Sequence, residues 1–326
     1  MLTNLRFSYI INDMALVTTQ QLTDYYDRYR ENEIVLSSDM MKLLGMNPRE
    51  IYVKCYGNQW PCIINSTSFQ LCRIIVGVRG GAYAMLSNKD VNIVSVRFSF
   101  VNSDRQPVAL FVNGRVEEIK PYMSSEELAV VTIAFTQRPP DDLIEKFGVI
   151  YDANENAIRR RDVRIVLNPD VNRVLGLEKK ETVIHVQGVP RNCILQDLSF
   201  SGAKILMMGI PKFIENQPIV LQIAFQDNLE VNQIPGVIVR TSSIEGRKDI
   251  LAAHIKFDEA NIPIQYKISI NNYMVMARKT ILMNQQNAGG GANSRGEKAD
   301  TRRIADLSGE GHNSNEENLT QEKLPI

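Results

Sequence analysis

The sequence predicts a mainly β protein with flanking helices, in which two small antiparallel β-barrels follow one another along the chain. Three observations support this fold class. Short runs rich in β-branched and aromatic residues, bounded by Gly, Pro, Asn, Asp or Ser, recur in two series. A helical pattern and a polar connector separate the two series, and a second helical pattern follows the last run. The length of 326 residues suits two domains.

The composition argues against several classes of protein. Lysine and arginine total 37, and aspartate and glutamate also total 37, so the chain has no net charge with which to attract nucleic acid over a long range. The apolar share of 44% and the charged share of 23% are typical of a globular protein. No apolar run reaches the length of a membrane span. We therefore expect a cytoplasmic protein without a membrane span.

The cysteines and histidines indicate no metal or catalytic centre. The four cysteines have no CxxC spacing and lie beside strand-like apolar residues, which predicts buried free thiols. The three histidines are too scattered for a metal cage or a catalytic triad, and His185 and His254 lie in alternating apolar runs. We therefore expect no catalytic residue, no metal ligand and no cofactor.

The first domain is expected over residues 1–152. The pattern is helical from Thr18, and a short helix with Ser38 as its N-cap ends at Gly45. Seven strand-like runs follow, at residues 51–57, 62–65, 71–78, 91–101, 108–112, 115–119 and 128–136. Between the fifth and sixth runs, the pair Asn113-Gly114 predicts a hairpin turn.

The boundary between the domains is expected in a connector over residues 153–165. A helix begins at Pro139-Pro140, with apolar residues at helical spacing up to Tyr151. The residues after it are polar and then basic, which is typical of an exposed link between two domains.

The second domain is expected over residues 166–283. Six strand-like runs lie at residues 164–168, 182–189, 193–208, 218–225, 236–243 and 249–257. Closure into a barrel would remove the exposed edges of so many short strands. A terminal helix is expected over residues 262–283. Residues 284–326 are polar and lack aromatic residues, which predicts a disordered tail.

Two short motifs fall in the connector and in the second domain. Arg160 and Arg164 form an RxxxR motif, with Arg159 and Arg161 beside them, and residues 197–202 form a DxSxxG motif. Taken singly, such arginines suit a solvated linker and such Asp-Ser-Gly runs suit a turn. A second DxSxxG match at residues 306–311 lies in the predicted tail, where no strand pattern flanks it.

The order of these features resembles the PilZ domain, the cyclic di-GMP receptor module of bacteria. The resemblance covers roughly residues 155–283. The first half resembles the PilZ-like N-terminal domain that precedes a PilZ domain in two-domain proteins of spirochaete type. That half has Gln70 where DxSxxG would have glycine, and no RxxxR precedes it. The resemblance therefore implies a single cyclic di-GMP site, in the second domain.

The resemblance implies that Arg160, Arg164, Asp197, Ser199 and Gly202 bind cyclic di-GMP. Arginine pairs with phosphate through a planar fork and also stacks on aromatic faces. An aspartate accepts from the N1–H and the exocyclic amine of guanine, a serine hydroxyl bonds to a phosphate or a base edge, and a glycine allows close approach of the backbone. The flanking pair, Arg159 and Arg161, is expected to act as an auxiliary.

We therefore expect a receptor that changes the relative orientation of its two domains when it binds the dinucleotide, and that acts on an unidentified downstream protein. Two alternatives remain open at this stage. A ligand-independent adaptor for protein partners fits the same pattern. A nucleic-acid-binding barrel regulated by the dinucleotide would use aromatic residues such as Tyr25, Tyr26, Tyr29 and Trp60.

Overall fold

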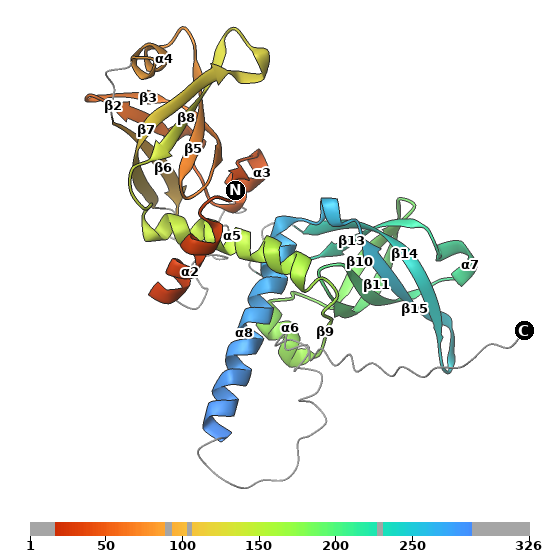
Figure 1. The fold of residues 1–326 in the computed structure, drawn as a ribbon. Coiled ribbons are helices and arrows are strands. Elements are labelled where there is room, and N and C mark those ends of the chain that lie inside the picture. Colours follow the sequence, from red (N-terminus) through yellow and green to blue (C-terminus); the bar gives the residue numbers. More distant parts are fainter. Residues whose placement is uncertain (1–16, 89–92, 103–105, 227–230, 289–326) are drawn as a thin grey trace, which may run out of the picture. The chain divides into compact units, whose positions relative to one another are not determined.

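The computed structural model describes residues 17–88, 93–102, 106–226 and 231–288, which form two antiparallel β-sheets and several helices (Figure 1). The predicted fold class, mainly β with flanking helices and two small antiparallel β-barrels in tandem, is confirmed, with a closed barrel in the second domain and an eight-stranded sheet in the first. The disorder predicted for the tail concerns residues 289–326, which lie outside the described residues.

The first sheet has eight strands in the order β1-β4-β5-β8-β7-β6-β2-β3. Its strands are β1 (Ile34–Val35), β2 (Tyr52–Cys55), β3 (Asn58–Pro61), β4 (Ile63–Thr67), β5 (Leu71–Gly77), β6 (Val94–Val101), β7 (Pro107–Pro121) and β8 (Leu128–Phe135). In β6, Val94, Val96 and Phe98 are at most 1% exposed, whereas the side chain of Arg97 between them is 25% exposed. The three apolar side chains belong to the core of the first domain.

The described helices of the first domain are α2 (Thr19–Tyr29), α3 (Ser38–Leu43), α4 (Gly81–Leu86) and α5 (Asp141–Arg159), with single 3-10 turns at Pro48–Glu50 and Tyr122–Ser124. Helices α2 and α3 begin at polar N-caps. Thr18 and Gln21 form a capping box at α2. The N-cap of α3 is Ser37, whose hydroxyl accepts from the Met40 N–H at 3.2 Å, so the expected cap at Ser38 was one residue late.

The hairpin predicted at Asn113-Gly114 does not form. Strand β7 runs straight through both residues and pairs with β6 on one side and with β8 on the other. A Cβ atom on Gly114 would lie 2.6 Å from the carbonyl oxygen of Ala134. The glycine therefore allows a close approach between β7 and β8, and does not serve a turn.

Helix α5 is longer than the sequence indicated. Residues 153–159, which were expected in the connector, form the last two turns of this helix. Its buried side includes Ile150, Ala153 and Asn156, so the buried stripe of the helix continues past Tyr151. The helix thus ends at Arg159, six residues before the first strand of the second domain, β9, begins at Ile165.

The second sheet has the order β10-β13-β14-β15-β12-β11-β9, and an additional pairing of β10 with β11 closes six of its strands into a barrel. The strands are β9 (Ile165–Val166), β10 (Glu181–Val186), β11 (Val189–Leu198), β12 (Gly202–Met208), β13 (Pro218–Ile223), β14 (Asn232–Ile244) and β15 (Arg247–Phe257). The apolar run at residues 193–208, expected as one strand, is split between β11 and β12. The DxSxxG motif therefore contains a turn.

The described part of the second domain contains three helices. They are α6 (Pro169–Leu175), α7 (Pro211–Ile214) and α8 (Ile264–Ala288), and a 3-10 turn at Glu259–Asn261 precedes α8. Helix α8 confirms the expected terminal helix and continues through residues 284–288, which were expected in the tail. Its residue Tyr266 is fully buried, and its ring meets the ring of Phe257 edge-on with centroids 5.7 Å apart.

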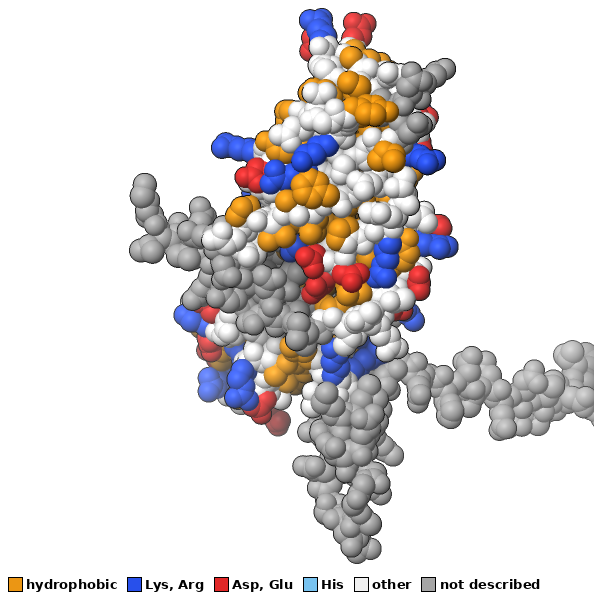
Figure 2. All heavy atoms as spheres, turned by 90° about the vertical axis from the view of Figure 1, so that its left-hand side faces the viewer, with side chains coloured by type: hydrophobic (Ala, Val, Ile, Leu, Met, Phe, Trp, Pro, Cys, Tyr) orange, Lys and Arg blue, Asp and Glu red, His pale blue; other side chains and the backbone are white. Residues whose placement is uncertain are grey.

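The cysteine prediction is confirmed, because all four cysteines are free and buried. Burial raises the pKa of the Cys62 and Cys193 thiols to about 12, so both stay protonated and unreactive at neutral pH. Figure 2 shows Lys and Arg side chains interspersed with Asp and Glu side chains on the visible face, as the balanced composition suggests.

Candidate functional site

The two arginines of the RxxxR motif lie on either side of one turn between α5 and β9. Arg160 is the C-cap of α5, and its backbone N–H donates to the carbonyl oxygen of Asn156 at 2.9 Å. The N–H of Val163 donates to the carbonyl oxygen of Arg160 at 3.1 Å, and Arg164 directly precedes β9. The arginines are thus presented by a short hydrogen-bonded turn and not by a long loop.

Arg164 forms an ion pair with Asp197, the first residue of the DxSxxG motif. The distance from Nη1 of Arg164 to Oδ1 of Asp197 is 2.5 Å. Strand pairing places Asp197 opposite Val166, which is two residues beyond Arg164. The Asp197 side chain is 14% exposed and that of Arg164 is 42% exposed. The carboxylate is therefore largely desolvated and needs a cationic or hydrogen-bonding partner.

A bulge in β11 orients the aspartate. The register of β11 against β12 shifts between Leu195 and Asp197. Such a bulge inserts an extra residue and re-aims the side chains that follow it. The bulge therefore helps to determine the direction in which the Asp197 side chain points.

Ser199 holds the turn of the DxSxxG motif together. Its side chain is fully buried, and its Oγ accepts from the Gly202 N–H at 3.1 Å and donates to the Gly202 carbonyl oxygen at 3.1 Å. The backbone N–H of Ser199 donates to the same carbonyl oxygen at 2.8 Å. The hydroxyl is thus engaged within the turn, where it fixes the conformation of the backbone that follows Asp197.

Gly202 is required by the packing of the sheet. A Cβ atom at this position would lie 2.2 Å from the carbonyl oxygen of Ile255 on the neighbouring strand β15. No side chain fits at that distance without a backbone shift. The glycine thus lets β12 and β15 approach closely directly after the motif turn.

The arginine turn is docked onto the motif turn by polar contacts. The Ser201 hydroxyl donates to Oδ1 of Asp162 at 2.7 Å, and the Ser201 N–H donates to the carbonyl oxygen of Arg161 at 3.0 Å. The Arg161 guanidinium forms an ion pair with Glu259. The two motifs, separated in sequence, therefore form one continuous structure.

The predicted auxiliary arginines have acidic partners in this structure. Arg159 pairs with Glu155 of the same helix at 3.0 Å, and Arg161 pairs with Glu259. Among the predicted residues the structure brings Arg164 and Asp197 into contact, with Ser199 and Gly202 in the turn that follows. The outward contact expected of Ser199 is not the one its hydroxyl makes here.

The sequence did not reveal three residues beside this site, namely Lys204, His254 and Arg240. Asp197 lies opposite Lys204, Lys204 lies opposite His254, and His254 lies opposite Arg240 on successive strands. Burial lowers the pKa of His254, and Arg240 and Lys204 lower it further. The only sequence signal was the alternation that puts Lys204 and His254 on the outer side of their strands, and the register that aligns them comes from tertiary structure.

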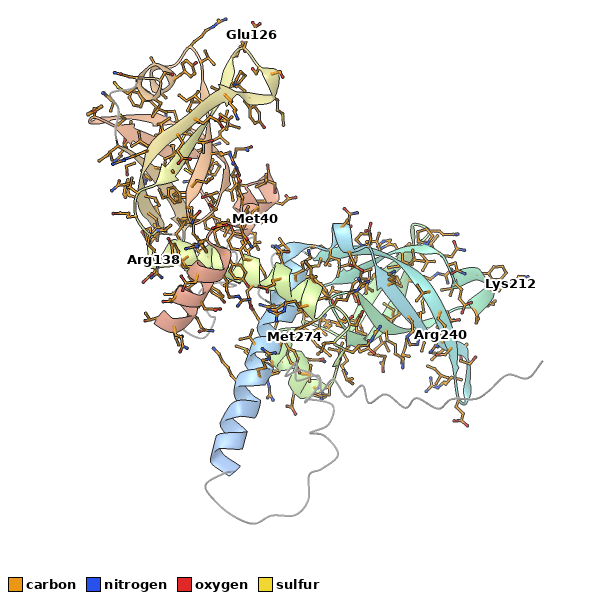
Figure 3. All side chains as sticks on the ribbon, in the orientation of Figure 1. Met40, Glu126, Arg138, Lys212, Arg240 and Met274 are labelled. Atoms are coloured by element: carbon orange, nitrogen blue, oxygen red, sulfur yellow. The ribbon has the colours of Figure 1, made fainter. Side chains whose placement is uncertain are left out.

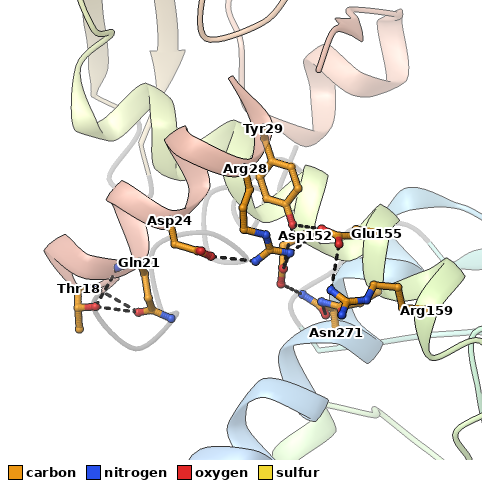
Figure 4. Close-up of polar contacts among 10 residues, drawn as sticks. Thr18, Gln21, Asp24, Arg28, Tyr29, Asp152, Glu155, Arg159 and Asn271 are labelled. Atoms are coloured by element: carbon orange, nitrogen blue, oxygen red, sulfur yellow. Dashed lines mark hydrogen bonds and ion pairs between the residues drawn. The ribbon is translucent and has the colours of Figure 1, made fainter. Parts of the chain in front are cut away.

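A buried polar network lies on helix α5 (Figure 4). The Nδ2 of Asn271 in α8 donates to Oδ2 of Asp152 at 2.9 Å, and the Nδ2 of Asn156 donates to Oδ1 of Asn271 at 2.9 Å. The Tyr29 hydroxyl of α2 donates to Oε2 of Glu155 at 2.6 Å. Helix α5 therefore carries hydrogen bonds to both α2 and the beginning of α8, one turn before the arginine motif.

The described residues contain no cluster of three or more His, Cys, Asp or Glu side chains placed to hold a metal ion. None of the described helices is long and apolar enough to cross a membrane.

The fold and the candidate site define a class of protein with two tandem β-domains, in which an RxxxR motif contacts a DxSxxG motif. Comparison with known proteins agrees with this class. Residues 20–154 match the family model of the PilZN3 domain, and residues 158–274 match that of the PilZ domain. The chain is 40% identical over 268 residues to a protein of Treponema denticola named "Cyclic di-GMP binding protein", a match that covers 82% of this chain and 85% of that protein. The chain belongs to the PilZ family, and the resemblance seen in the sequence is confirmed.

The chain is also similar to solved structures. One is the Borreliella burgdorferi PlzA protein in complex with c-di-GMP, with 23% identity, a TM-score of 0.35, and coverage of 78% of this chain and 98% of that chain. Another is Escherichia coli YcgR in complex with c-di-GMP, with 12% identity, a TM-score of 0.25, and coverage of 82% of this chain and 91% of that chain.

Proposed function

We propose that this chain is a receptor for cyclic di-GMP and not an enzyme, and that it binds the dinucleotide between the arginine turn and the DxSxxG turn. The observation that carries the proposal is the contact between Arg164 and Asp197, which joins the two motifs at one place. The name of the Treponema denticola relative supports the choice of ligand.

The chemistry of the two side chains suits this ligand. Cyclic di-GMP has two anionic phosphodiesters and two guanine bases. A guanidinium binds a phosphodiester through two parallel N–H donors and can also stack on a purine. A carboxylate accepts from the N1–H and the exocyclic amine of guanine, which adenine cannot offer in the same arrangement.

Binding would exchange one ion pair for two new interactions. In the free protein the Arg164 guanidinium and the Asp197 carboxylate satisfy each other. A phosphodiester can take over the guanidinium while a guanine edge takes over the carboxylate, so that neither charge is left desolvated without a partner. Arg160, on the other side of the same turn, would close on the ligand together with Arg164.

The other motif residues would act on the shape of the site. Ser199 would keep the turn after Asp197 in place through its bonds to Gly202, and Gly202 would keep β12 against β15. Arg159 and Arg161 would join the ligand only by leaving Glu155 and Glu259. We therefore assign the first role in ligand contact to Arg160, Arg164 and Asp197.

The output of binding would be a change in the orientation of the two domains. The turn that carries both motif arginines directly follows α5, the last helix of the first domain. Any change in that turn is transmitted to the helix through the cap at Arg160. We propose that a downstream protein reads the change through the first domain.

Calorimetric titration of the full chain with cyclic di-GMP tests the proposal, with GTP and cyclic di-AMP as competing ligands. We expect saturable binding of cyclic di-GMP, with much weaker binding of GTP and cyclic di-AMP, and loss of binding in the double variant Arg160→Ala/Arg164→Ala. Arg138→Ala is the matched control, because Arg138 in the first domain is 41% exposed and pairs with Asp141 at 3.1 Å. That variant should bind as the wild type does.

Absence of binding by the folded wild-type chain would overturn the receptor assignment and favour the ligand-independent adaptor. Undiminished binding by the double variant would overturn the assignment of the site. Tight binding of single-stranded nucleic acid in a parallel titration would favour the nucleic-acid-binding alternative instead.

A further inference from the structure

Four strands of the second barrel align a row of polar side chains on its outer surface. The register is continuous from Asp197 on β11 through Lys204 on β12 and His254 on β15 to Arg240 on β14. Residues directly opposite one another share a face of the sheet, so these four side chains project to the same side. We call Lys204, His254 and Arg240 the cationic row.

The burial of the neighbouring residues identifies this side as the outer one. The residues flanking the row along β12 and β15 are core residues, among them Ala203, Ile205, Ala253 and Ile255, each at most 2% exposed. Within the row, Lys204 and His254 are half-buried and Arg240 is exposed. Figure 3 shows Arg240 on the second barrel. The row therefore forms a surface that a ligand in contact with Asp197 can reach.

The row has an excess of positive charge. At its end, Asp197 is neutralised by Arg164. Within the described part of the chain, neither Lys204 nor Arg240 lies within ion-pair distance of an acidic side chain. His254 stands between these two cations, and they are among the groups that disfavour its protonation.

The spacing suits a ligand larger than a single phosphate. Neighbouring strands lie about 4.8 Å apart, so the distance across the four strands from Asp197 to Arg240, at the far end of the cationic row, is roughly 14 Å. If Asp197 holds a guanine edge and Arg164 holds one phosphodiester, the remainder of a cyclic dinucleotide lies along the sheet, in the direction of the cationic row or away from it. The first direction offers Lys204 and Arg240 to its second phosphodiester, and the other leads back to the arginine turn that already holds the first phosphodiester.

We propose that Lys204, His254 and Arg240 form a second anion-binding subsite, which binds the phosphodiester of cyclic di-GMP that Arg164 does not hold. This inference rests on the proposed function and adds ligand-binding residues outside both motifs. Lys204 supplies an ammonium close to Asp197, Arg240 supplies a guanidinium at the far end, and the imidazole of His254 supplies an N–H donor between them.

The test is calorimetric titration of the full chain with cyclic di-GMP at two salt concentrations. The variant is Lys204→Gln/Arg240→Gln, which removes two charges but keeps long polar side chains. The matched control is Arg191→Gln/Lys212→Gln, because both residues are exposed in the same domain, on β11 and α7, and their loss changes the net charge equally. The thermal midpoint of each variant is measured to verify folding.

We expect the row variant to bind about tenfold more weakly than the wild type at low salt, and to lose part of the salt dependence of affinity. The control should remain within about twofold of the wild type. An unchanged stoichiometry in the row variant means that the row binds the same ligand molecule, and we expect this outcome. A row variant that binds as tightly as the control would overturn the inference.

The failure of this inference is distinguishable from failure of the proposed function. If the wild type binds and Arg164→Ala abolishes binding while the row variant binds normally, only the subsite is wrong. If the stoichiometry falls by half in the row variant, the row holds a second dinucleotide and the inference of a shared ligand is overturned. If the folded wild type does not bind cyclic di-GMP, both proposals are overturned.

Discussion

The hydroxyl of Tyr266, in the first turn of α8, donates a hydrogen bond of 2.7 Å to the backbone carbonyl oxygen of Ser199. Both residues are fully buried, and the tyrosine ring also packs against Phe257. The terminal helix of the second domain thus holds the motif turn through a buried hydrogen bond, while the arginine turn contacts it through Ser201. The position of the DxSxxG turn is determined by two elements that lie outside the motif.

We therefore expect Tyr266→Phe to lower the free energy of unfolding by about 1 to 3 kcal/mol, because a buried carbonyl oxygen loses its donor. Affinity for cyclic di-GMP should fall as well, since the turn after Asp197 becomes less well held. Urea denaturation and calorimetry measure the two effects. Tyr273→Phe on the same helix is the control, and an equal loss in both variants would contradict a specific role for Tyr266.

Gly202 provides a second test of the motif turn. We expect Gly202→Ala to destabilise the chain by about 2 kcal/mol or more, since its Cβ would lie 2.2 Å from the Ile255 carbonyl oxygen. Gly77→Ala is the matched control, because Gly77 also lies at the end of a strand and nothing stands within 4 Å of its Cβ position. The control should change the free energy of unfolding by less than about 0.5 kcal/mol. Equal stability of both variants in urea denaturation would show that the strands can separate without cost.

Local patterns predicted most of the strands, because alternation and turn residues act over a few neighbours. Val94, Val96 and Phe98 are an example of such a pattern. Asn113-Gly114 misled because a glycine that serves a turn and a glycine that allows close approach of two strands have the same local sequence signal.

The candidate site was proposed from the sequence only as far as its residues belong to motifs. The resemblance carried by the order of the two motifs placed Arg164 and Asp197 in one candidate site, and the contact between them became visible only in the structure. Lys204, His254 and Arg240 could not be found, because each is one polar residue in an alternating strand. They become neighbours only through the register of three strand pairs, and a shift of one residue in any pair would separate them.

The polar network on α5 is expected to contribute to stability through Asn271. Asn271→Ala removes the donor to Asp152 and the acceptor of Asn156, and all three side chains are at most 9% exposed. We expect a loss of about 2 to 3 kcal/mol in the free energy of unfolding, because two buried groups lose partners. Asn261→Ala is the control, since Asn261 is exposed and bonds only locally to Asp258 at 2.7 Å. Similar losses for the two variants would contradict a buried network.

The affinity for cyclic di-GMP is expected to rise as the pH falls from about 8 to about 5.5. Burial lowers the pKa of His254, with further lowering by Arg240, Lys204 and Arg164 and an opposing effect of Asp197, so its imidazole is neutral at neutral pH. A bound phosphodiester stabilises the imidazolium and raises this pKa in the complex. Binding then takes up a proton, and affinity increases as the pH falls through the interval between the two pKa values.

The stability of the free protein should respond to pH in the opposite direction. Because the pKa of His254 is lower in the folded chain than in the unfolded chain, its contribution to stability is present above the unfolded pKa and is lost as the pH falls. His254→Gln should flatten both profiles below pH of about 7. A pH profile of affinity that is the same in wild type and His254→Gln would contradict a contact between His254 and the ligand.

Asp197→Asn is expected to relax the preference for guanine. The amide keeps one acceptor oxygen, but its NH₂ group faces donors of the guanine edge where the carboxylate had a second acceptor. We expect affinity for cyclic di-GMP to fall about tenfold or more, with a much smaller change for cyclic di-AMP. The free energy of unfolding should change by less than about 1 kcal/mol, because the partner Arg164 is 42% exposed and solvent screens the ion pair.

The difference between the affinity changes for cyclic di-GMP and cyclic di-AMP shows whether Asp197 recognises the base or only positions Arg164. If Asp197 only held Arg164 in place, the substitution would weaken both dinucleotides equally, and Arg164→Lys, which keeps the charge but loses the planar fork, would have a similar effect. If Asp197 reads the base, its variant loses selectivity while Arg164→Lys loses affinity and keeps selectivity. Competition titrations with the two cyclic dinucleotides on both variants therefore assign the base contact to one residue and the phosphate contact to the other.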